Sequence, residues 1–245
     1  MPLGIHGRGN DFFAFARHHR SGQHIIGYPI GQLSDDIGRR RGNQHHVRAF
    51  RQRTGKMGYA LAKHCAQRGA EVTLITGKTQ LEPPLFVRVI EVESAGEMFE
   101  AVKERYEEQD IIMKAAAVAD YRPLSVSEEK VKKTEGEMSI ALERTEDILK
   151  FLGENRRKGQ FLCGFSMETE NMLENSRAKL EKKHADMIVA NNLKQEGAGF
   201  GTDTNIVTLI TRDGCRELPV MSKEDVAKHI IDTIQNHLLS DDPLL

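Results

Sequence analysis

The sequence predicts an α/β fold: a Rossmann-like, mostly parallel sheet with helices on both faces and an antiparallel hairpin near the C-terminus. Three observations support this prediction. From Gly55 onward, short apolar segments alternate with segments whose apolar residues recur at helical spacing. The short segments are apolar throughout, which is typical of strands covered on both faces. Near the C-terminus, Asp213-Gly214 separates two such segments, as in a β-hairpin.

The expected elements follow in chain order. The first helix covers residues 56–68 and ends at Gly69, a residue type suited to a helix C-terminal cap. Ser94 and Glu97 form a capping box that begins a second helix, expected to continue to residue 106. Further helices are expected at 146–155, 169–183 and 222–239, the middle one with Met172, Leu173, Ser176 and Leu180 inward. Strands are expected at 71–76, 86–92, 110–113, 138–142, 160–165, 187–190, 205–211 and 216–220.

Composition and charge narrow the functional classes. The 245 residues include 35 Lys+Arg and 36 Asp+Glu, and the formal net charge of −1 does not favour binding to nucleic acid or to an anionic membrane. No uncharged apolar stretch of about 18 residues occurs, so we expect no membrane span. Three widely spaced cysteines match neither a disulfide framework nor a zinc site, and they favour a reducing, cytoplasmic location.

The first 54 residues differ in composition from the rest. They contain no lysine and no glutamate, but nine arginines and six of the ten histidines. A basic arm that binds nucleic acid or an acidic partner has such a charge, although these arms usually mix lysine with arginine. The alternative is a reading-frame artefact, because a shifted frame loses the commonest residues. Within this segment, only residues 23–30 have a strand-like pattern.

Ligands of a parallel sheet bind beyond the carboxyl ends of its strands, so the loops at that edge are candidate sites. The helix start at Gly55-Lys56 suits a phosphate, although a glycine there is more often a packing device. After the 110–113 strand, four alanines within residues 115–119 allow a flat base or ribose to approach the backbone. Asp120 can accept hydrogen bonds from ribose hydroxyls or hold a metal ion. It can equally cap a tight helix–sheet contact.

Two groups of lysines accompany these loops. Lys130 begins a Lys-Val-Lys-Lys run that is either a solvated face or a cationic flap closing over a polyphosphate. Lys179 and Lys183 lie one helical turn apart, where they can hold a triphosphate, although neighbouring glutamates also fit a solvated face. The sequence has no acyl-enzyme motif and no clustered metal ligands. Its chemistry is therefore expected to depend on positioning and charge neutralisation, as in nucleotidyl transfer.

Eight segments occur in order at a familiar spacing: GKMGYALAKHCAQRGAEVTLITG, AAAVADYRP, KVKK, EDIL, GFSMETEN, AKLEKK, DMIVAN and GAGFGTDTN. With them the chain resembles the phosphopantothenate–cysteine ligases, particularly the ligase half of the bacterial bifunctional decarboxylase/ligase of coenzyme A synthesis. The resemblance covers about residues 55–234. It implies a homodimeric, CTP-dependent ligase that requires Mg²⁺ or Mn²⁺. In such an enzyme 4′-phosphopantothenate reacts with CTP to form an acyl-cytidylate, and cysteine then displaces CMP.

The resemblance also implies roles for individual residues. Lys130 is the expected flap lysine on the triphosphate and the residue expected to be catalytic. The expected CTP-binding residues, besides Lys130, are Ala116, Ala117, Asp120, Glu146, Asp147, Ile148, Leu149, Phe165, Lys179 and Lys183. Thr145-Glu146 stands where the family has Asn-Pro before the aspartate. No metal ligand is assigned, and no FMN is expected because the resemblance does not reach the flavin-dependent decarboxylase half.

The departure from the family lies before Gly55. The family has a strand, a Gly-Gly-Thr loop and an asparagine expected to stabilise the acyl-cytidylate. Here Arg51 occupies the asparagine position, and Arg39-Arg40-Arg41 lies beside the loop position. We therefore expect an aberrant, frameshifted or disordered segment at 1–53, a ligase domain at 54–239 and a tail at 240–245.

Two other functions are weighed against the ligase. The first is a catalytically impaired fragment that keeps only CTP binding or dimerisation. The second is a nicotinamide-dependent oxidoreductase, which would need a G-x-G-x-x-G motif after the first strand and an acidic residue about 20 positions later. Neither feature is found in the sequence.

Overall fold

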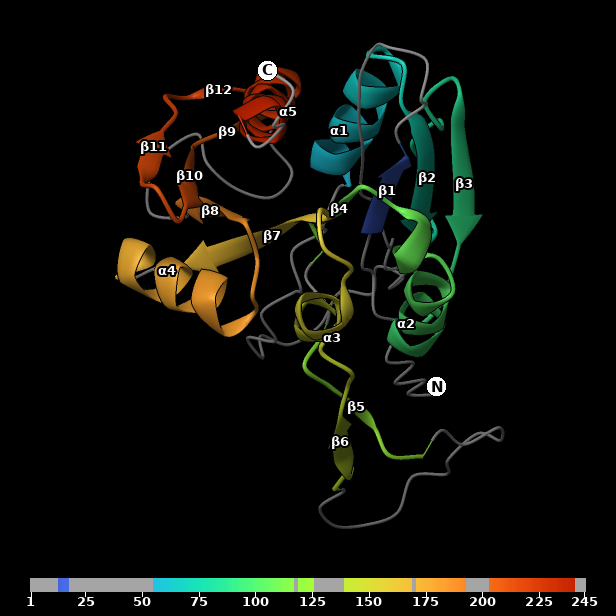
Figure 1. The fold of residues 1–245 in the computed structure, drawn as a ribbon. Coiled ribbons are helices and arrows are strands. Elements are labelled where there is room, and N and C mark those ends of the chain that lie inside the picture. Colours follow the sequence, from blue (N-terminus) through green and yellow to red (C-terminus); the bar gives the residue numbers. More distant parts are fainter. Residues whose placement is uncertain are drawn as a thin grey trace, which may run out of the picture.

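The computed structural model describes residues 13–17, 55–116, 119–125, 139–168, 171–192 and 203–240 (Figure 1). Their helices are α1 Lys56–Ala66, α2 Ala95–Lys103, α3 Ile148–Asn155, α4 Met172–Lys182, α5 Lys223–Ser240 and a short 3₁₀ helix, Tyr106–Glu108. Their strands are β1 Phe13–Arg17, β2 Glu71–Thr76, β3 Val87–Glu91, β4 Ile111–Lys114, β5 Tyr121–Pro123, β6 Leu142–Arg144, β7 Phe161–Glu168, β8 Met187–Asn192, β9 Thr204–Asn205, β10 Val207–Thr211, β11 Cys215–Glu217 and β12 Met221–Ser222.

The main sheet has eight strands in the order β11-β10-β8-β7-β4-β1-β2-β3. β2 pairs parallel with β3, and β4, β7 and β8 pair parallel in turn. Because β1 is antiparallel to both β2 and β4, these five strands run in one direction. β10 runs antiparallel to β8 and pairs with β11 across Asp213-Gly214. The predicted mostly parallel sheet with a C-terminal antiparallel hairpin is confirmed.

Each face of the sheet has its own hydrophobic core because successive strand residues point to opposite faces. Helices α1 and α5 cover one face, and α2, α3 and α4 cover the other (Figure 1). The α1–α5 side buries Val72, Ile111, Met113, Cys163, Val189 and Leu209. The opposite side buries Ile75, Ile112, Leu162, Ile188 and Ile210. The uniformly apolar strands are thereby explained.

Local capping starts two helices where the sequence predicts it. At α2, the Ser94 hydroxyl accepts a hydrogen bond from the Glu97 N–H, and the Glu97 carboxylate accepts one from the Glu93 N–H. At α5, the Ser222 hydroxyl accepts from the Asp225 N–H and donates to its carboxylate. Such caps stabilise a helix by about 0.5–2 kcal/mol. None of the helices in the described part of the chain is both long and apolar enough to cross a bilayer.

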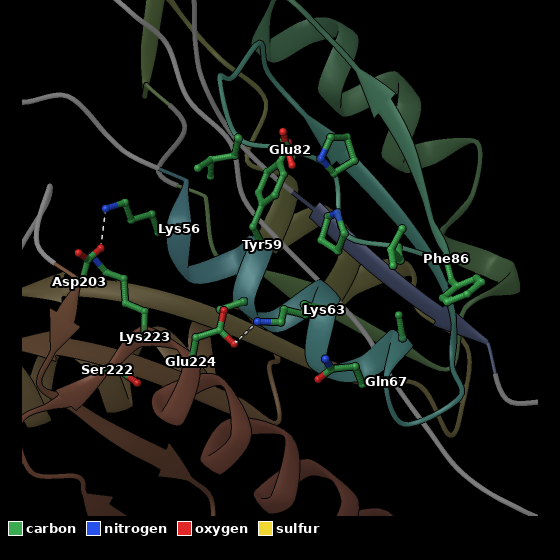
Figure 2. Close-up of a pocket in the computed structure, with 16 residues that line it drawn as sticks. Lys56, Tyr59, Lys63, Gln67, Glu82, Phe86, Asp203, Ser222, Lys223 and Glu224 are labelled. Carbon is green, nitrogen blue, oxygen red and sulfur yellow. Dashed lines mark hydrogen bonds and ion pairs between the residues drawn. The ribbon is translucent and has the colours of Figure 1, made fainter.

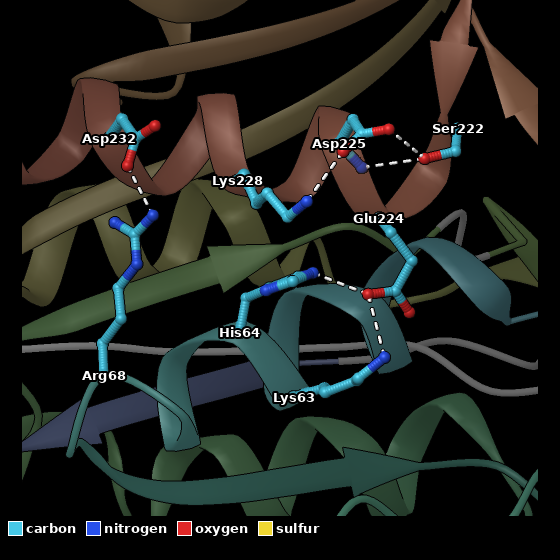
Figure 3. Close-up of polar contacts among 8 residues, drawn as sticks. All are labelled: Lys63, His64, Arg68, Ser222, Glu224, Asp225, Lys228 and Asp232. Carbon is cyan, nitrogen blue, oxygen red and sulfur yellow. Dashed lines mark hydrogen bonds and ion pairs between the residues drawn. The ribbon is translucent and has the colours of Figure 1, made fainter.

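Helices α1 and α5 lie side by side and are joined by polar contacts (Figure 3). Arg68 at the end of α1 lies 2.5 Å from Asp232. Near the start of α5, the Glu224 carboxylate lies 3.1 Å from the Lys63 ammonium nitrogen and 2.6 Å from Nε2 of His64. These contacts place the start of α5 beside the second half of α1, so that the two helices run in the same direction.

Strand β1 occupies the centre of the sheet, between β2 and β4. In a doubly wound sheet, the strand at this position runs parallel to its neighbours and leads directly into a helix. β1 instead runs antiparallel to both, so its carboxyl end lies at the edge opposite the ligand-binding loops. The sequence pattern does not reveal this strand, and the strand-like segment 23–30 lies outside the described residues.

Several expected elements differ in detail from the structure. β6 begins at Leu142, where the expected strand ends, because it pairs with β5 in a separate two-stranded sheet. β5 lies where the sequence predicts no strand, since three residues carry no periodic pattern. In α4, Ser176 and Leu180 are buried as predicted, but Leu173 is exposed. Its inward assignment is wrong because only a narrow stripe of α4 faces the sheet.

Candidate functional site

The candidate site lies where β4 and β7 end, because the carboxyl ends of these two parallel strands are side by side. Lys114 and Gly164 are register partners, so the alanine loop that follows β4 lies level with Phe165. Ala116 is buried, whereas Asp120 is exposed to solvent. Thr145 holds the loop, because its hydroxyl donates to the Ala119 carbonyl at 2.5 Å and its N–H to the Asp120 carbonyl at 3.1 Å.

Asp147 and Lys183 form an ion pair beside this loop. Asp147 is the N-cap of α3 and accepts a hydrogen bond from the Lys150 N–H at 3.0 Å. Its other carboxylate oxygen accepts from the Lys183 ammonium group, whose side chain is only 14% exposed. Burial alone would raise the pKa of Asp147, but the hydrogen bonds from Lys183 and Lys150 and the nearby Lys114 charge lower it below its usual value. A fixed negative charge therefore holds Lys183 in place.

Lys179 approaches the same region from α4. Its ammonium group donates to the Phe165 carbonyl at 3.0 Å. Burial lowers the pKa of Lys179, and the Lys183 charge acts in the same direction, while Glu168, Asp147 and Asp120 oppose the shift. Lys179 thus interacts electrostatically with both Lys183 and Asp120. Lys179, Lys183 and Asp120 therefore lie in the same region, near the carboxyl end of β7.

The packing of α4 against β7 and α3 determines where Lys179 and Lys183 lie relative to the sheet. Ser166 and Ser176 share a buried hydrogen bond of 2.7 Å between strand and helix. Where α4 ends, the Lys183 carbonyl passes so close to Gly153 that an added Cβ would lie 1.9 Å from it. Glycine at 153 therefore permits the close approach of α3 and the end of α4.

The remaining predicted site residues have different positions. Glu146 lies 4.0 Å from Arg122 and is partly exposed. Ile148 and Leu149 are almost fully buried in the core, so their side chains do not face solvent, and only their backbone can approach a ligand. Phe165 is half-buried. Ala117 and Lys130 lie outside the described residues.

Sequence reasoning missed Lys114, which closes the same cluster. Its ammonium group donates to the Ala116 carbonyl at 3.0 Å, so it ties the end of β4 to the alanine loop. Its charge also acts on Asp147. The available signal in the sequence was a lysine at the end of an otherwise apolar strand, because such a charge is costly to bury without a role.

A groove of about 930 Å³ lies between α1, the 81–86 loop and the start of α5 (Figure 2). One end has Lys56, Lys223 and Asp203, and the opposite wall is the apolar 81–86 loop with Pro83 and Pro84. None of the residues that line it belongs to the alanine loop or to α4. It is therefore a separate concavity, on the α1–α5 side of the sheet.

The described residues hold no group of three or more His, Cys, Asp or Glu side chains arranged to bind a metal ion. Within them Cys65 and Cys163 are buried, Cys215 is exposed, and all three are free thiols. Burial strongly raises the pKa of the Cys163 thiol, with a smaller contribution from Asp186, so this group is not a nucleophile at neutral pH. Chemistry by charged, positioned groups is the option that the geometry supports.

The fold and its charged strand edge define the class of the molecule: a doubly wound α/β domain with its ligand loops at the carboxyl ends of parallel strands. The chain belongs to the DNA/pantothenate metabolism flavoprotein C-terminal domain family, whose sequence profile matches residues 41–238. The matched range begins before Gly55, within the segment of unusual composition.

Known relatives agree with this assignment. The chain is 51% identical over 183 residues to the coenzyme A biosynthesis bifunctional protein CoaBC of Bacillus subtilis (strain 168), covering 74% of this chain and 45% of that protein. It is 41% identical over 184 residues to CoaBC of Vibrio vulnificus (strain YJ016), covering 74% of this chain and 46% of that protein. The crystal structure of a CoaBC C-terminal domain matches with a TM-score of 0.66 at 41% identity, over 87% of this chain and 93% of that domain. The chain spans about half the length of the curated relatives it matches.

Proposed function

We propose that this chain joins 4′-phosphopantothenate to cysteine in a CTP-dependent reaction of coenzyme A biosynthesis. Its family and its relatives named for coenzyme A biosynthesis support the pathway. The observation that carries the proposal is the convergence of Lys179 and Lys183 on the alanine loop with Asp120. Cationic groups held beside a flat, small-residue loop match a nucleoside triphosphate, whose base and ribose need a close backbone and whose phosphates need positive charge.

The reaction needs no protein nucleophile. In the first step, a carboxylate oxygen of 4′-phosphopantothenate attacks the α-phosphorus of CTP, and the bond to pyrophosphate breaks. In the second step, the cysteine nitrogen attacks the activated carbonyl carbon, loses a proton and displaces CMP. Lysines that are positioned before the reaction stabilise the charge that develops on pyrophosphate. The buried Cys65 and Cys163 and the high pKa of Cys163 agree with a mechanism without a thiol nucleophile.

Individual residues take the following roles in this proposal. Asp120 accepts hydrogen bonds from the ribose, and the backbone of Ala116 and Ala117 lines the base pocket. Lys179 and Lys183 bind the phosphates, with Phe165 as a neighbouring wall. Glu146, Asp147, Ile148 and Leu149 place the amino end of α3 against the nucleotide, two of them through buried side chains that anchor the turn.

The divalent cation fits this site as a partner of the nucleotide. Mg²⁺ usually binds through substrate phosphates and one or two carboxylates, so a preformed cluster of protein ligands is not required. Asp120 is the exposed carboxylate next to the alanine loop and suits that role. When bound, Mg²⁺ or Mn²⁺ would neutralise phosphate charge. We propose no role for FMN in this chain.

Lys130 is proposed as the flap lysine that reaches the triphosphate. Replacing it by glutamine removes a preorganised charge, and we expect a loss of about 2–4 kcal/mol of transition-state stabilisation. The measurement is kcat/KM for CTP in a chain with ligase activity. Unchanged turnover of Lys130→Gln would remove this role.

We further propose that the active form is a homodimer joined through the β5–β6 arm. In Figure 1 the two strands extend away from the main sheet. The arm and its flanks expose several large apolar side chains: Tyr121, Leu124, Ile140 and Leu142. Exposed apolar groups gathered on a projecting ribbon are typical of an interaction surface. We expect a dimer in sedimentation, and a monomer after Leu142→Asp; a wild-type monomer at micromolar concentration contradicts the proposal.

The proposed function is tested by turnover. The chain is mixed with 4′-phosphopantothenate, cysteine and either CTP or NAD(H), and CMP and amide product are measured. CTP should support product formation and protect the fold against unfolding, whereas NAD(H) should do neither. CMP release that does not depend on cysteine would contradict the ligase.

A second candidate is an impaired fragment that binds CTP without completing the ligation. The antiparallel course of β1 favours it, because no direct connection from the central strand then reaches the ligand edge. Residues 1–53 are proposed to derive from a shifted reading frame, with the ligase domain at 54–239. Restoring the family pattern before Gly55 should raise turnover strongly if this is correct. A cytoplasmic location, where thiols stay reduced, is proposed for either form.

A further inference from the structure

The alanine loop, residues 115–120, is held near both of its ends by hydrogen bonds from two neighbouring residues. At the first end, the ammonium group of Lys114, the last residue of β4, donates to the Ala116 carbonyl at 3.0 Å. At the other end, the Thr145 hydroxyl donates to the Ala119 carbonyl at 2.5 Å, and the Thr145 N–H donates to the Asp120 carbonyl at 3.1 Å. We call Lys114 and Thr145 the loop supports.

An alanine-rich loop needs such supports, because a methyl group packs weakly and forms no hydrogen bond. Ordering the backbone of a loop costs conformational entropy, which contacts of the loop must offset. Ala116 is buried against the core on the α1–α5 side, but Ala119 and Asp120 are exposed. Side-chain packing therefore anchors the first end of the loop, whereas the second end depends on the hydrogen bonds from Thr145.

Lys114 points to the side of the sheet that carries α3 and α4. Residues two apart in a strand share a face, and Ile112 belongs to the core on that side. The Lys114 charge acts on Asp147, at the start of α3, and contributes to lowering the pKa of that carboxyl group. The half-buried ammonium group thus interacts with a carbonyl of the loop and with a carboxylate of the protein. These contacts suit a support for the loop better than a ligand of phosphate.

Thr145 lies at the start of the turn that leads into α3. Its N–H bond to the Asp120 carbonyl continues the β5–β6 ladder by one step beyond the last register pair, Tyr121 with Arg144 (Figure 1). Two residues later, Asp147 caps α3 and accepts a hydrogen bond from Lys183. One turn therefore contacts both the alanine loop and a lysine of the nucleotide site.

We propose that Lys114 and Thr145 are positioning residues, which hold the alanine loop in the shape that receives the base and ribose before the nucleotide binds. This inference rests on the proposed ligase function, in which the loop binds the nucleoside and Lys179 and Lys183 bind the phosphates. A site that is ordered in only a fraction of the molecules loses affinity by that fraction. The loop supports remove this loss, so they act on the nucleoside part of CTP.

The experiment compares binding of CTP with binding of cytidine, which has no phosphate. Chemical-shift titration of the full chain, without acyl substrate or cysteine, measures both affinities. Cytidine binding should weaken about 10-fold in Lys114→Met and about 3-fold in Thr145→Val, as for the loss of a charged and of a neutral hydrogen bond, and CTP binding should weaken by at least the same factors. Lys179→Met should weaken CTP binding but leave cytidine binding unchanged.

Matched controls separate positioning from general effects of the substitutions. Lys150→Met removes an exposed lysine of α3 that pairs with Glu154 at 3.6 Å. Thr233→Val removes a hydroxyl that donates to the His229 carbonyl within α5. Neither control should change the affinity for cytidine. Thr145→Ser keeps the hydroxyl and should restore most of the affinity that Thr145→Val loses.

The outcomes distinguish this inference from the proposed function. Unchanged cytidine affinity in Lys114→Met or in Thr145→Val removes the positioning role of that residue. Weaker CTP binding with unchanged cytidine binding in Lys114→Met would make Lys114 a phosphate ligand instead. Cytidine binding in Thr145→Ser as weak as in Thr145→Val would exclude the hydroxyl as the cause. A wild-type chain that binds neither CTP nor cytidine rejects the proposed function, and this inference with it.

Discussion

The two faces of the sheet each present a pair of lysines, and the pairs differ in how the protein holds them. On the α4 side, Lys179 donates to a backbone carbonyl and Lys183 to the carboxylate that caps α3. On the α1–α5 side, Lys56 pairs with the exposed carboxylate of Asp203, whereas the Lys223 backbone N–H donates to the Asp203 carbonyl. Fixed charges suit a transition state because they cost no reorganisation when the reaction occurs.

The largest effect is expected on the α4 side, from replacing Lys179. Lys179→Met should lower kcat/KM for CTP by about 10²–10³-fold, as for other preorganised donors, because a half-buried ammonium group is lost. Lys182→Met is the matched control, since Lys182 is exposed on the same helix. Steady-state kinetics with CTP as the varied substrate provide the measurement. Equal losses in both variants would mean that the position of Lys179 has no special role.

The second prediction concerns the packing that holds Lys183. Gly153→Ala places a methyl group against the Lys183 carbonyl, and neither backbone can yield easily. We expect the free energy of unfolding to fall by about 1–3 kcal/mol, as for other overpacked sites. Urea unfolding measures it. Gly214→Ala is the control, because a Cβ there meets no atom within 4 Å, and a similar loss in that variant would contradict the packing argument.

The third prediction sharpens the comparison through acid stability. Hydrogen bonds from Lys183 and Lys150 overcome the effect of burial and lower the pKa of Asp147, so its stabilising contribution is present above its usual pKa and is lost as the pH falls below it. Asp147→Asn keeps the helix cap but removes the charge. At neutral pH we expect a cost of about 0.2–1 kcal/mol, since the pair is partly exposed.

The control for Asp147→Asn is the corresponding change in the ion pair of Asp203 with Lys56, Asp203→Asn, which should cost less because the Asp203 carboxylate is more exposed. Chemical unfolding at several pH values measures both. A wild-type stability that rises between neutral and acidic pH would contradict the sign of the Asp147 prediction.

The smallest expected effect is at His64, between α1 and α5 (Figure 3). Burial lowers the pKa of His64, Lys228 and Lys63 add to this, and Glu224 offsets only part of it. The unfolded chain therefore takes up a proton more readily as the pH falls below about 6.5, and stability decreases there. His64→Gln should show a flatter stability profile below that pH. An identical profile in the variant would mean that other groups cause the pH dependence.

Much of the fold is predictable from local sequence. The strand at Glu71–Thr76 and the caps of α2 and α5 occur where the pattern places them, because their signals lie within a few residues. The β5–β6 arm is not predictable in this way. Its two short strands are far apart in the chain, and each is strand only because the other is present.

The sequence indicates that Lys179 and Lys183 share one side of a helix, but it does not indicate which residues they contact. Lys179 and Lys183 are one turn apart on a helix, which periodicity reveals. That Lys183 pairs with Asp147, and that Lys114 ties down the alanine loop, depends on where α3 and β4 end in space. The inward assignment of Leu173 failed for the same reason, since the neighbours of α4 decide which of its sides is buried.

By itself the sequence determined the alternation of strands and helices, the caps, and the family, because these depend on local periodicity and on motif order. Only the tertiary structure decided that β1 enters the centre of the sheet in reverse, and that Lys56 at the start of α1 meets the carboxylate of Asp203. Pairing across more than 100 residues of chain has no local signature. It follows from the burial of two apolar faces, which fixes where distant charges meet.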